Sequence, residues 1–312
     1  MKQTLHIALV ACSIIVAIVL AEIGLRVIGV GAPPAFASHP QYGYLMKPSQ
    51  WVSTRGIAFQ INSAGLRGTD FTPQKPPGTF RLVFVGDSIT YGGGSIADAN
   101  LFTNRVAAAL QVARGQTVEI INLSAPGWGI ENMVGYINMN GVYDADVVLW
   151  VLPECDFRRP KMSLEENHFP TVQPWSRLFY IAYTAIIQFK SWQKDVVSAN
   201  DETLFKSNVD LLIETLQKLM LDHSRVGLVV LPSEEQTESY ELDLVAIRTA
   251  ARVRSIAVLD VTHTFQIHRT EGLYMDGAHL SSSGHKVMAE AITKFLHESL
   301  APTTVMQSSL GH

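Results

Sequence analysis

The sequence is poor in residues that build several common kinds of site. Only two of its 312 residues are cysteines, Cys12 and Cys155, and Cys12 lies in an apolar run, so no disulfide framework is expected. Its 24 lysines and arginines are outnumbered by 28 acidic residues. Because no basic excess is available to hold phosphates, a nucleic-acid partner is excluded. The ten histidines show no paired ligand spacing, so we expect no metal site.

The N-terminus carries a long apolar run. Residues 7–21 follow Lys2 and contain no charged side chain, and the apolar character then continues past Glu22 and Arg26, which stand one helical turn apart. A run of this length is typical of a membrane segment.

We interpret residues 1–30 as an uncleaved single-pass membrane anchor. The alternative is a signal peptide cleaved after the "AFA" at 35–37, although that site lies well beyond the apolar run. The positive charge of Lys2 favours a cytoplasmic N-terminus, which places the rest of the chain across the membrane.

The remaining chain divides into three parts. Residues 31–79 are rich in turn-forming residues and are interpreted as an extension that packs on the following domain. Residues 80–299 form the predicted catalytic domain, with an insertion at 157–200, and residues 300–312 form a tail.

Strand-length apolar runs alternate with amphipathic helical stretches in the main domain. Strands are predicted at 81–86, 117–123, 145–152, 226–231 and 256–260. Helices are predicted near 99–113, 129–140, 203–222, 240–253 and 283–298. This alternation indicates an α/β fold with a doubly wound, mostly parallel sheet between two layers of helices.

The insertion at 157–200 interrupts this alternation with an aromatic stretch, "PWSRLFYIAYTAIIQFKSW". We expect a helix packed on the body of the domain, because an apolar helical stripe usually faces a core. A lid, or a surface that touches lipid, is the alternative.

A serine lies at the end of the first predicted strand, in "RLVFVGDSIT" at 81–90. Ligands of open parallel sheets bind at the carboxyl ends of the strands, and Ser88 lies at such an end, at the start of a turn into a helix. A serine hydroxyl is a poor nucleophile unless a base takes its proton. A histidine partner is therefore required.

The strongest histidine candidate lies in "YMDGAHLSSSGH" at 274–285, before the last helix. Asp276 precedes His279 by three residues, so within a turn its carboxylate can orient the imidazole. His285 is the competitor, but it falls at the start of the helix. Ser88, His279 and Asp276 are therefore the predicted catalytic triad.

Three motifs in this order carry a family resemblance. The stretches "FVGDSIT", "INLSAPGWG" and "DGAHLSSSGH" resemble the serine, glycine and aspartate-histidine blocks of the SGNH hydrolases, also called GDSL-type esterases and lipases. The resemblance covers about residues 80–298. It implies the flavodoxin-like fold of that family and a mechanism without cofactor or metal.

The resemblance also implies residue roles. Ser88 attacks an ester carbonyl, His279 acts as base and then as acid, and Asp276 orients His279. The backbone N–H groups of Ser88 and Gly127 form the oxyanion hole; Gly127 suits this role because glycine lets a ligand approach the backbone closely. The stretch "INSAGLRG" and the anchor are similar to a membrane-anchored bacterial branch, which implies the cytoplasmic membrane with a periplasmic or extracellular domain.

The third block departs from the family pattern. Where the family has Gly-x-Asn-Asp, this chain has "PECDF", so Cys155 replaces the asparagine that donates to the oxyanion, while Asp156 remains. A thiol is a weak donor, and losing one oxyanion donor costs on the order of 100 to 1,000-fold in rate. Asn122 is a second candidate for the missing donor, beside Cys155 itself.

The leading hypothesis is a serine esterase that hydrolyses acyl esters, O-acetyl esters among them, on a glycan or a lipid. The first alternative is an O-acyltransferase acting on a cell-surface glycan, served by a membrane protein that donates the acyl group. The second is a catalytically weak binding or assembly protein, which the loss of the asparagine motivates.

Overall fold

The computed structural model describes residues 2–54, 56–192, 202–222, 224–232, 234 and 238–299. Part of the predicted 157–200 insertion and the whole 300–312 tail lie outside these residues. At the centre is a parallel sheet in the order β6-β5-β7-β8-β9. Its strands are β5 (Phe80–Gly86), β6 (Val118–Ser124), β7 (Val147–Pro153), β8 (Arg225–Leu231) and β9 (Ala257–Asp260).

The central strands are apolar on both faces because helices cover both. Every residue of β5 is buried, and its side chains alternate between two cores: Val83 and Val85 face one, and Leu82 and Phe84 face the other. Burial on both faces is typical of parallel strands.

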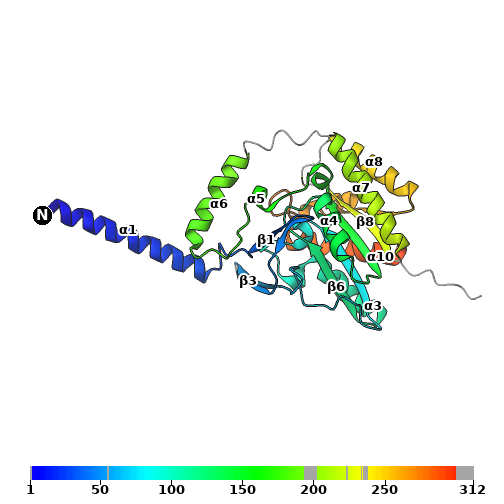
Figure 1. The fold of residues 1–312 in the computed structure, drawn as a ribbon, viewed down its shortest axis with the longest axis horizontal. Coiled ribbons are helices and arrows are strands. Elements are labelled where there is room, and N and C mark those ends of the chain that lie inside the picture. The colour runs from blue at the N-terminus through cyan, green and yellow to red at the C-terminus, as the bar shows by residue number, and fades with distance from the viewer. Residues whose placement is uncertain are drawn as a thin grey trace, which may run out of the picture.

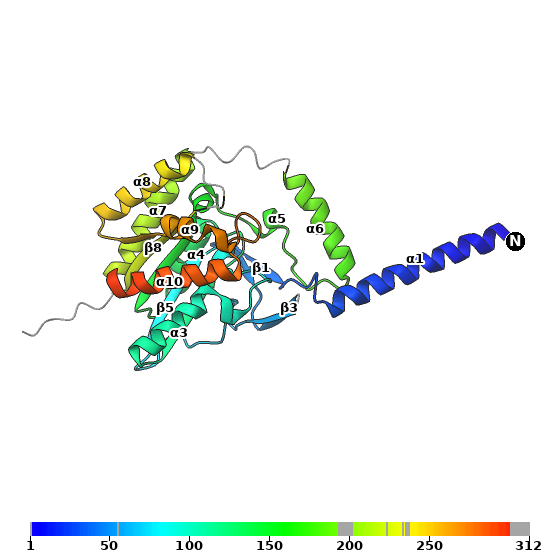
Figure 2. The ribbon, with the colours of Figure 1, turned by 180° about the vertical axis from the view of Figure 1, so that it is seen from behind.

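Helices complete two outer layers (Figures 1 and 2). The first core contains side chains of α4 (Ile130–Asn140), α7 (Glu202–Leu221) and α8 (Glu238–Val253). The second contains side chains of α3 (Phe102–Arg114), α9 (Thr262–Ile267) and α10 (Ser282–Ser299). The three-layer α/β fold predicted from the sequence is confirmed, with each predicted strand and helix of the domain found close to its expected place.

The segment before the sheet forms two antiparallel hairpins. The first pairs β1 (Phe36–His39) with β2 (Gly43–Met46), and the second pairs β3 (Gln50–Thr54) with β4 (Ile57–Ile61). Isolated bridges from Arg67 to Ile61 and to Asn122 join the second hairpin to edge strand β6. The hairpin therefore covers a sheet edge that would otherwise expose unpaired backbone groups.

Arg67 fixes the loop at 91–98, which follows β5 in the chain. Its side chain is 1% exposed and pairs with Asp98 at 2.8 Å. Its guanidinium also donates to the carbonyls of Tyr91, Gly93 and Ile96. One buried side chain thus ties the segment at 91–98 to the N-terminal extension.

Two helices lie outside these layers. Helix α1 (Lys2–Val27) extends away from the body, and its segment Gln3–Val27 is long and apolar enough to cross a membrane (Figure 1). Helix α6 (Arg177–Trp192) stands between α1 and the body. The expectation that this helix packs on the body is wrong, because Phe179 and Ile186 are exposed and its first turn is bonded to α1.

Candidate active site

The backbone at the end of β5 presents Ser88 in a tight turn. A Cβ at Gly86 would lie 2.2 Å from Thr90 Oγ1 and 2.8 Å from the Val151 carbonyl oxygen, so only glycine fits there. The Asp87 carboxylate accepts the Ile89 N–H at 2.9 Å and caps α2 (Ser88–Tyr91). Helix α2 is a single turn, and Ser88 is its first residue.

The structure brings the three predicted triad residues into one hydrogen-bonded chain. The distance from Ser88 Oγ to His279 Nε2 is 3.0 Å. On the other side of the imidazole, His279 Nδ1 lies 2.9 Å from Asp276 Oδ2. The order hydroxyl, imidazole, carboxylate is the one that activates a serine for nucleophilic attack.

Backbone donors keep Asp276 in place. Its Oδ1 accepts the N–H of His279 at 2.8 Å and that of Ala278 at 3.3 Å. Although partial burial acts in the opposite direction, these bonds and the bond to the imidazole lower the pKa of Asp276. The Asp276 carboxylate is therefore ionised at neutral pH in the folded protein.

The triad is open to solvent. The side chains of His279 and Asp276 are 40% and 58% exposed. Water can therefore reach the imidazole without a movement of the backbone.

His285 is a core residue. Its side chain is buried, it accepts the Phe102 N–H at 3.2 Å through Nδ1, and it stacks on the Phe102 ring. Burial, with the charges of Arg67 and Arg105, lowers the pKa of His285 to about 3. His285 is therefore neutral and is held in the core against Phe102, and it makes no contact with Ser88.

The N–H groups of Ser88 and Gly127 have no hydrogen-bond acceptor among the residues that the structure describes. Gly127 adopts φ +76°, and a Cβ there would lie 2.6 Å from Asn167 Oδ1. Asn167 ends α5 (Leu164–Asn167). The left-handed backbone conformation therefore favours glycine at this position, and a Cβ would displace the end of the Asn167 side chain.

The two side chains considered for the missing donor are placed differently. The Asn122 amide nitrogen already donates to the Thr90 carbonyl at 2.8 Å, and its oxygen accepts the Ser124 hydroxyl. Cys155 lies exposed in η2 (Glu154–Arg158). Surrounding protein atoms and then the Asp156 carboxylate raise the pKa of the Cys155 thiol although part of its surface is exposed, so at neutral pH it is a protonated, weak donor.

A cation not anticipated from the sequence lies beside Cys155. Arg159 Nη2 is 3.3 Å from the Cys155 sulfur, while Nη1 donates to the Trp128 carbonyl at 3.0 Å and to Asp87 Oδ2 at 3.2 Å. Asp87 Oδ2 in turn lies 3.3 Å from Ser88 Oγ. Arg159 therefore connects the serine, glycine and third motifs.

Asp156 makes the third anchor for this guanidinium. Its Oδ1 accepts from Arg159 Nη1, and its side chain is fully buried. Burial raises the pKa of Asp156, and the Arg159 cation opposes that rise. Without the arginine, two buried carboxyl groups, Asp87 and Asp156, would lie together with no cation to compensate them.

Residues 82–292 match the GDSL-like lipase/acylhydrolase family. The chain belongs to this family. It is accordingly an ester hydrolase, and the matched span contains Ser88, Gly127, Asp276 and His279. The sequence resemblance to GDSL-type esterases is thereby confirmed.

Solved structures with a similar fold include three esterases or lipases. An acetyl xylan esterase is 16% identical, with 69% of this chain and 98% of that chain covered and a TM-score of 0.49. An acetylxylan esterase from Geobacillus stearothermophilus is 16% identical, with coverage of 69% and 93% and a TM-score of 0.44. A lipase/acylhydrolase from Enterococcus faecalis is 16% identical, with coverage of 70% and 95% and a TM-score of 0.45. A search of curated proteins returned no match.

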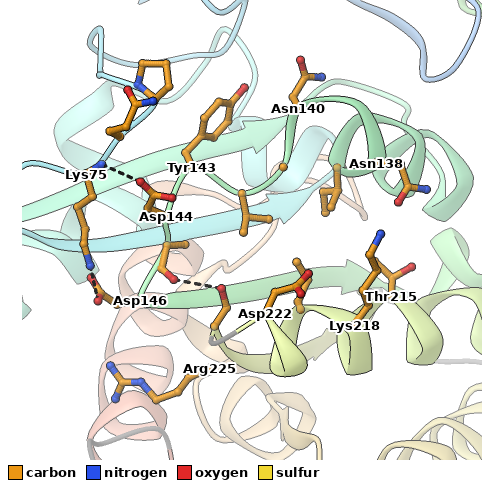
Figure 3. Close-up of a pocket in the computed structure, with 18 residues that line it drawn as sticks. Lys75, Asn138, Asn140, Tyr143, Asp144, Asp146, Thr215, Lys218, Asp222 and Arg225 are labelled. Atoms are coloured by element: carbon orange, nitrogen blue, oxygen red, sulfur yellow. Dashed lines mark hydrogen bonds and ion pairs between the residues drawn. The ribbon is translucent and has the colours of Figure 1, made fainter.

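A cavity of about 860 Å³ lies at the opposite, amino end of the strands (Figure 3). Two acidic side chains of its wall contact Lys75: Lys75 Nζ pairs with Asp146, and the Lys75 backbone N–H donates to Asp144 at 3.2 Å. Figure 3 shows both contacts of Lys75 on the cavity wall. None of the family's sequence blocks reaches this cavity.

Two arginines near the site were missed by sequence reasoning. Arg159 follows the Cys155-Asp156 motif by only a few residues, and that proximity was the available signal. Arg67 lies in "INSAGLRG", where an arginine among small and apolar residues is the signal of a buried cation. Among the described residues, no group of His, Cys, Asp and Glu is arranged to hold a metal ion.

Proposed function

We propose that this GDSL-like hydrolase is a serine esterase that cleaves acyl esters through an acyl-serine intermediate. The observation that carries the proposal is the contact of 3.0 Å between Ser88 Oγ and His279 Nε2, with Asp276 bound to the opposite ring nitrogen. A nucleophile, a base and an orienting carboxylate are then aligned at the carboxyl end of β5.

The reaction proceeds in two halves. Ser88 Oγ attacks the ester carbonyl while His279 Nε2 takes its proton, and the imidazolium then protonates the departing alcohol. Water next attacks the acyl-serine, with His279 taking the proton from the water and returning it to Ser88 Oγ. Asp276 stabilises the imidazolium in both halves.

The backbone N–H groups of Ser88 and Gly127 hold the negative oxygen that forms in each half. Their lack of an acceptor among the described residues supports this role, because a preorganised donor must be free when the charge develops. Arg159 adds a positive charge at the side where the family has an asparagine donor. We assign to Arg159 the role of a positioning residue that compensates for Cys155.

We favour release of the acyl group to water over transfer to a sugar hydroxyl. Transfer requires that water be kept from the acyl-enzyme. The 40% exposure of the His279 side chain supports hydrolysis, because solvent reaches the base directly. If transfer to a glycan were the main reaction, a soluble sugar acceptor would accelerate acyl-enzyme breakdown and yield an acylated sugar.

The proposed location is the bacterial cytoplasmic membrane, with α1 as a single-pass anchor and the hydrolase domain on the periplasmic or outer side. The length and apolar composition of Gln3–Val27 support it. An anchored esterase has access to esters carried on glycans or lipids at the membrane, which we propose as its substrate class.

Hydrolysis of short-chain nitrophenyl esters tests the proposal. The full chain in detergent is compared with Ser88→Ala and His279→Ala, and circular dichroism verifies that each variant is folded. The proposal expects turnover by the wild type and near-complete loss in both variants. A folded wild type with no turnover, or a Ser88→Ala variant as active as the wild type, contradicts it.

A further inference from the structure

A band of large apolar side chains on α6 and just before it is exposed. Trp175, Phe179, Tyr183 and Ile186 are 84, 65, 45 and 59% exposed. Phe179, Tyr183 and Ile186 are spaced by four and three residues, so they share one helical face. Arg177 and Thr184 lie on the opposite face. A soluble protein rarely leaves such a stripe in water.

The start of α6 is bonded to the end of α1. The Glu22 carboxylate accepts the N–H groups of Arg177 at 3.1 Å and Leu178 at 3.0 Å. It thereby satisfies two of the free N–H groups that begin α6 and places a negative charge at the positive end of the helix.

The bonding also runs in the other direction. Arg177 Nη1 donates to the Leu25 carbonyl at 3.2 Å, near the end of α1, and Arg26 donates to the Trp175 carbonyl. The two charges that interrupt the apolar N-terminal run, Glu22 and Arg26, therefore join the two helices. Each helix supplies partners for the free backbone groups of the other.

This junction sets the level of α6 relative to a membrane. If α1 crosses the bilayer, the end at Val27 lies where the helix leaves the hydrocarbon region, and α6 begins at the same level. From there α6 runs across the axis of α1 rather than along it (Figures 1 and 2). A helix in that position lies along the membrane surface.

The residue types of the band suit that environment. Trp and Tyr are enriched at the boundary between headgroups and acyl chains, where an apolar ring and a polar tip are both satisfied. An amphipathic helix lying in the interface buries its apolar face at this depth. Trp175, Tyr183, Phe179 and Ile186 provide such a face.

We propose that α6, with Trp175, is an interfacial helix that docks on the lipid surface beside the anchor α1. The inference rests on the proposed anchoring by α1, and it adds a second, monotopic contact that fixes the orientation of the hydrolase domain. Trp175, Phe179 and Tyr183 also line a groove of about 580 Å³ between α5 and α6, together with Phe169.

Helix α5 lies between this groove and the catalytic site. The groove wall includes Leu164 of α5, and Asn167, at the other end of that helix, packs against Gly127.

Depth-dependent fluorescence quenching tests the inference. The full chain is reconstituted in vesicles of phosphatidylcholine and phosphatidylglycerol, with Cys155→Ser throughout. An environment-sensitive fluorophore is attached at native Cys12, or at Ile186→Cys or Thr184→Cys in a Cys12→Ser background. Nitroxide-bearing lipids quench from the centre of the bilayer or from just below the headgroups.

The expected result is strong quenching of residue 186 by the shallow nitroxide, little at residue 184, and quenching of Cys12 by the deep nitroxide. Quenching of Cys12 without quenching of residue 186 leaves the anchor intact and overturns the interfacial helix. Equal quenching at 184 and 186 also overturns it, because a helix lying in the interface has a wet face. Absence of quenching at Cys12 overturns both the anchor and the inference.

Turnover separates docking from catalysis. Phe179→Glu with Ile186→Glu leaves hydrolysis of a soluble nitrophenyl ester unchanged but lowers hydrolysis of the same ester on a vesicle-embedded lipid several-fold. If the variant hydrolyses the vesicle-embedded ester as fast as the wild type does, the inference is contradicted. If the wild type does not hydrolyse the soluble ester at all, the proposed esterase function is contradicted instead.

Discussion

The two ends of the central sheet differ in how their polar groups are used. At the amino end, Lys75 and Asp146 line a cavity of about 860 Å³ but neutralise each other. At the carboxyl end, Ser88 and Gly127 keep free N–H groups within the described structure, and a histidine reaches the hydroxyl. Cavity size therefore does not mark the site; convergent groups with unused hydrogen-bonding capacity do.

The largest expected effect is on kcat, which should depend on residues at the carboxyl end of the sheet and not on those at the amino end. Ser88→Ala and His279→Ala should each lower kcat on a nitrophenyl ester by roughly 10⁴-fold or more, because either change removes the activated nucleophile. The double variant should be no worse than the single ones, since the two side chains act as a unit.

Lys218→Met is the matched control at the amino end, because Lys218 is an exposed residue lining the other cavity. It should leave kcat unchanged. A large loss in this variant would show that the amino-end cavity takes part in the reaction.

The second effect concerns Arg159 and the departure at Cys155. Arg159→Met should lower kcat by about 100 to 1,000-fold, the scale of one oxyanion donor, with little change in KM. It should also lower the free energy of unfolding, because it leaves the buried Asp87 and Asp156 without a cation, so circular dichroism must verify that the variant is folded. Arg159→Lys keeps the charge but not the forked geometry, and should lose less.

Cys155→Asn restores the asparagine donor of the family. In the wild-type background it should raise kcat, and in the Arg159→Met background it should recover part of the lost kcat. The recovery measures compensation directly. No gain from the asparagine in either background would show that Arg159 does not substitute for it.

A third comparison sets the two ends against each other in stability. Arg67 is buried and donates to three loop carbonyls at the carboxyl end, so Arg67→Met should lower the free energy of unfolding by about 3–5 kcal/mol. Lys75→Met removes a partly exposed pair at the amino end and should cost about 1 kcal/mol or less. Urea unfolding of both variants measures the difference, and equal costs would contradict the role given to Arg67.

The smallest effect is a pKa shift at Asp276. Its pKa is lowered in the fold, so its NMR titration midpoint should lie below the ordinary value of 3.8. The associated stability is present above that value and is lost as the pH falls through the folded pKa. In His279→Ala the midpoint should rise but stay lowered, because the backbone N–H donors at 278 and 279 remain. A midpoint above 3.8 in the wild type would contradict the assignment.

Much of this organisation follows from local sequence patterns. The five strands of the sheet were predicted because buried parallel strands are continuous apolar runs, and α7 and α10 because their leucine or methionine stripes repeat at helical spacing. The hairpins at 36–61 were not predicted, since strands of four or five residues with mixed polar side chains carry little periodicity. The amphipathic pattern of α6 was visible, but periodicity cannot say what an apolar face contacts.

The site shows the same limit. Ser88, Asp276 and His279 stand in short motifs whose chemistry can be recognised in the sequence, and the structure brings them together. The partners of Arg159 come from three separate segments, at Asp87, Trp128 and Asp156, so its role depends on tertiary structure. Asn122 lies in the glycine motif, and that its amide nitrogen donates to the Thr90 carbonyl is also known only from the tertiary structure.

Covalent labelling tests the central claim most directly. The full chain is treated with a fluorophosphonate, and the modified peptide is located by mass spectrometry in the wild type, Ser88→Ala and His279→Ala. The account predicts one modification at Ser88, absent from Ser88→Ala and strongly slowed in His279→Ala. Equal labelling of Ser88→Ala, or labelling of the wild type only at another residue, would contradict the assignment of Ser88 as the nucleophile.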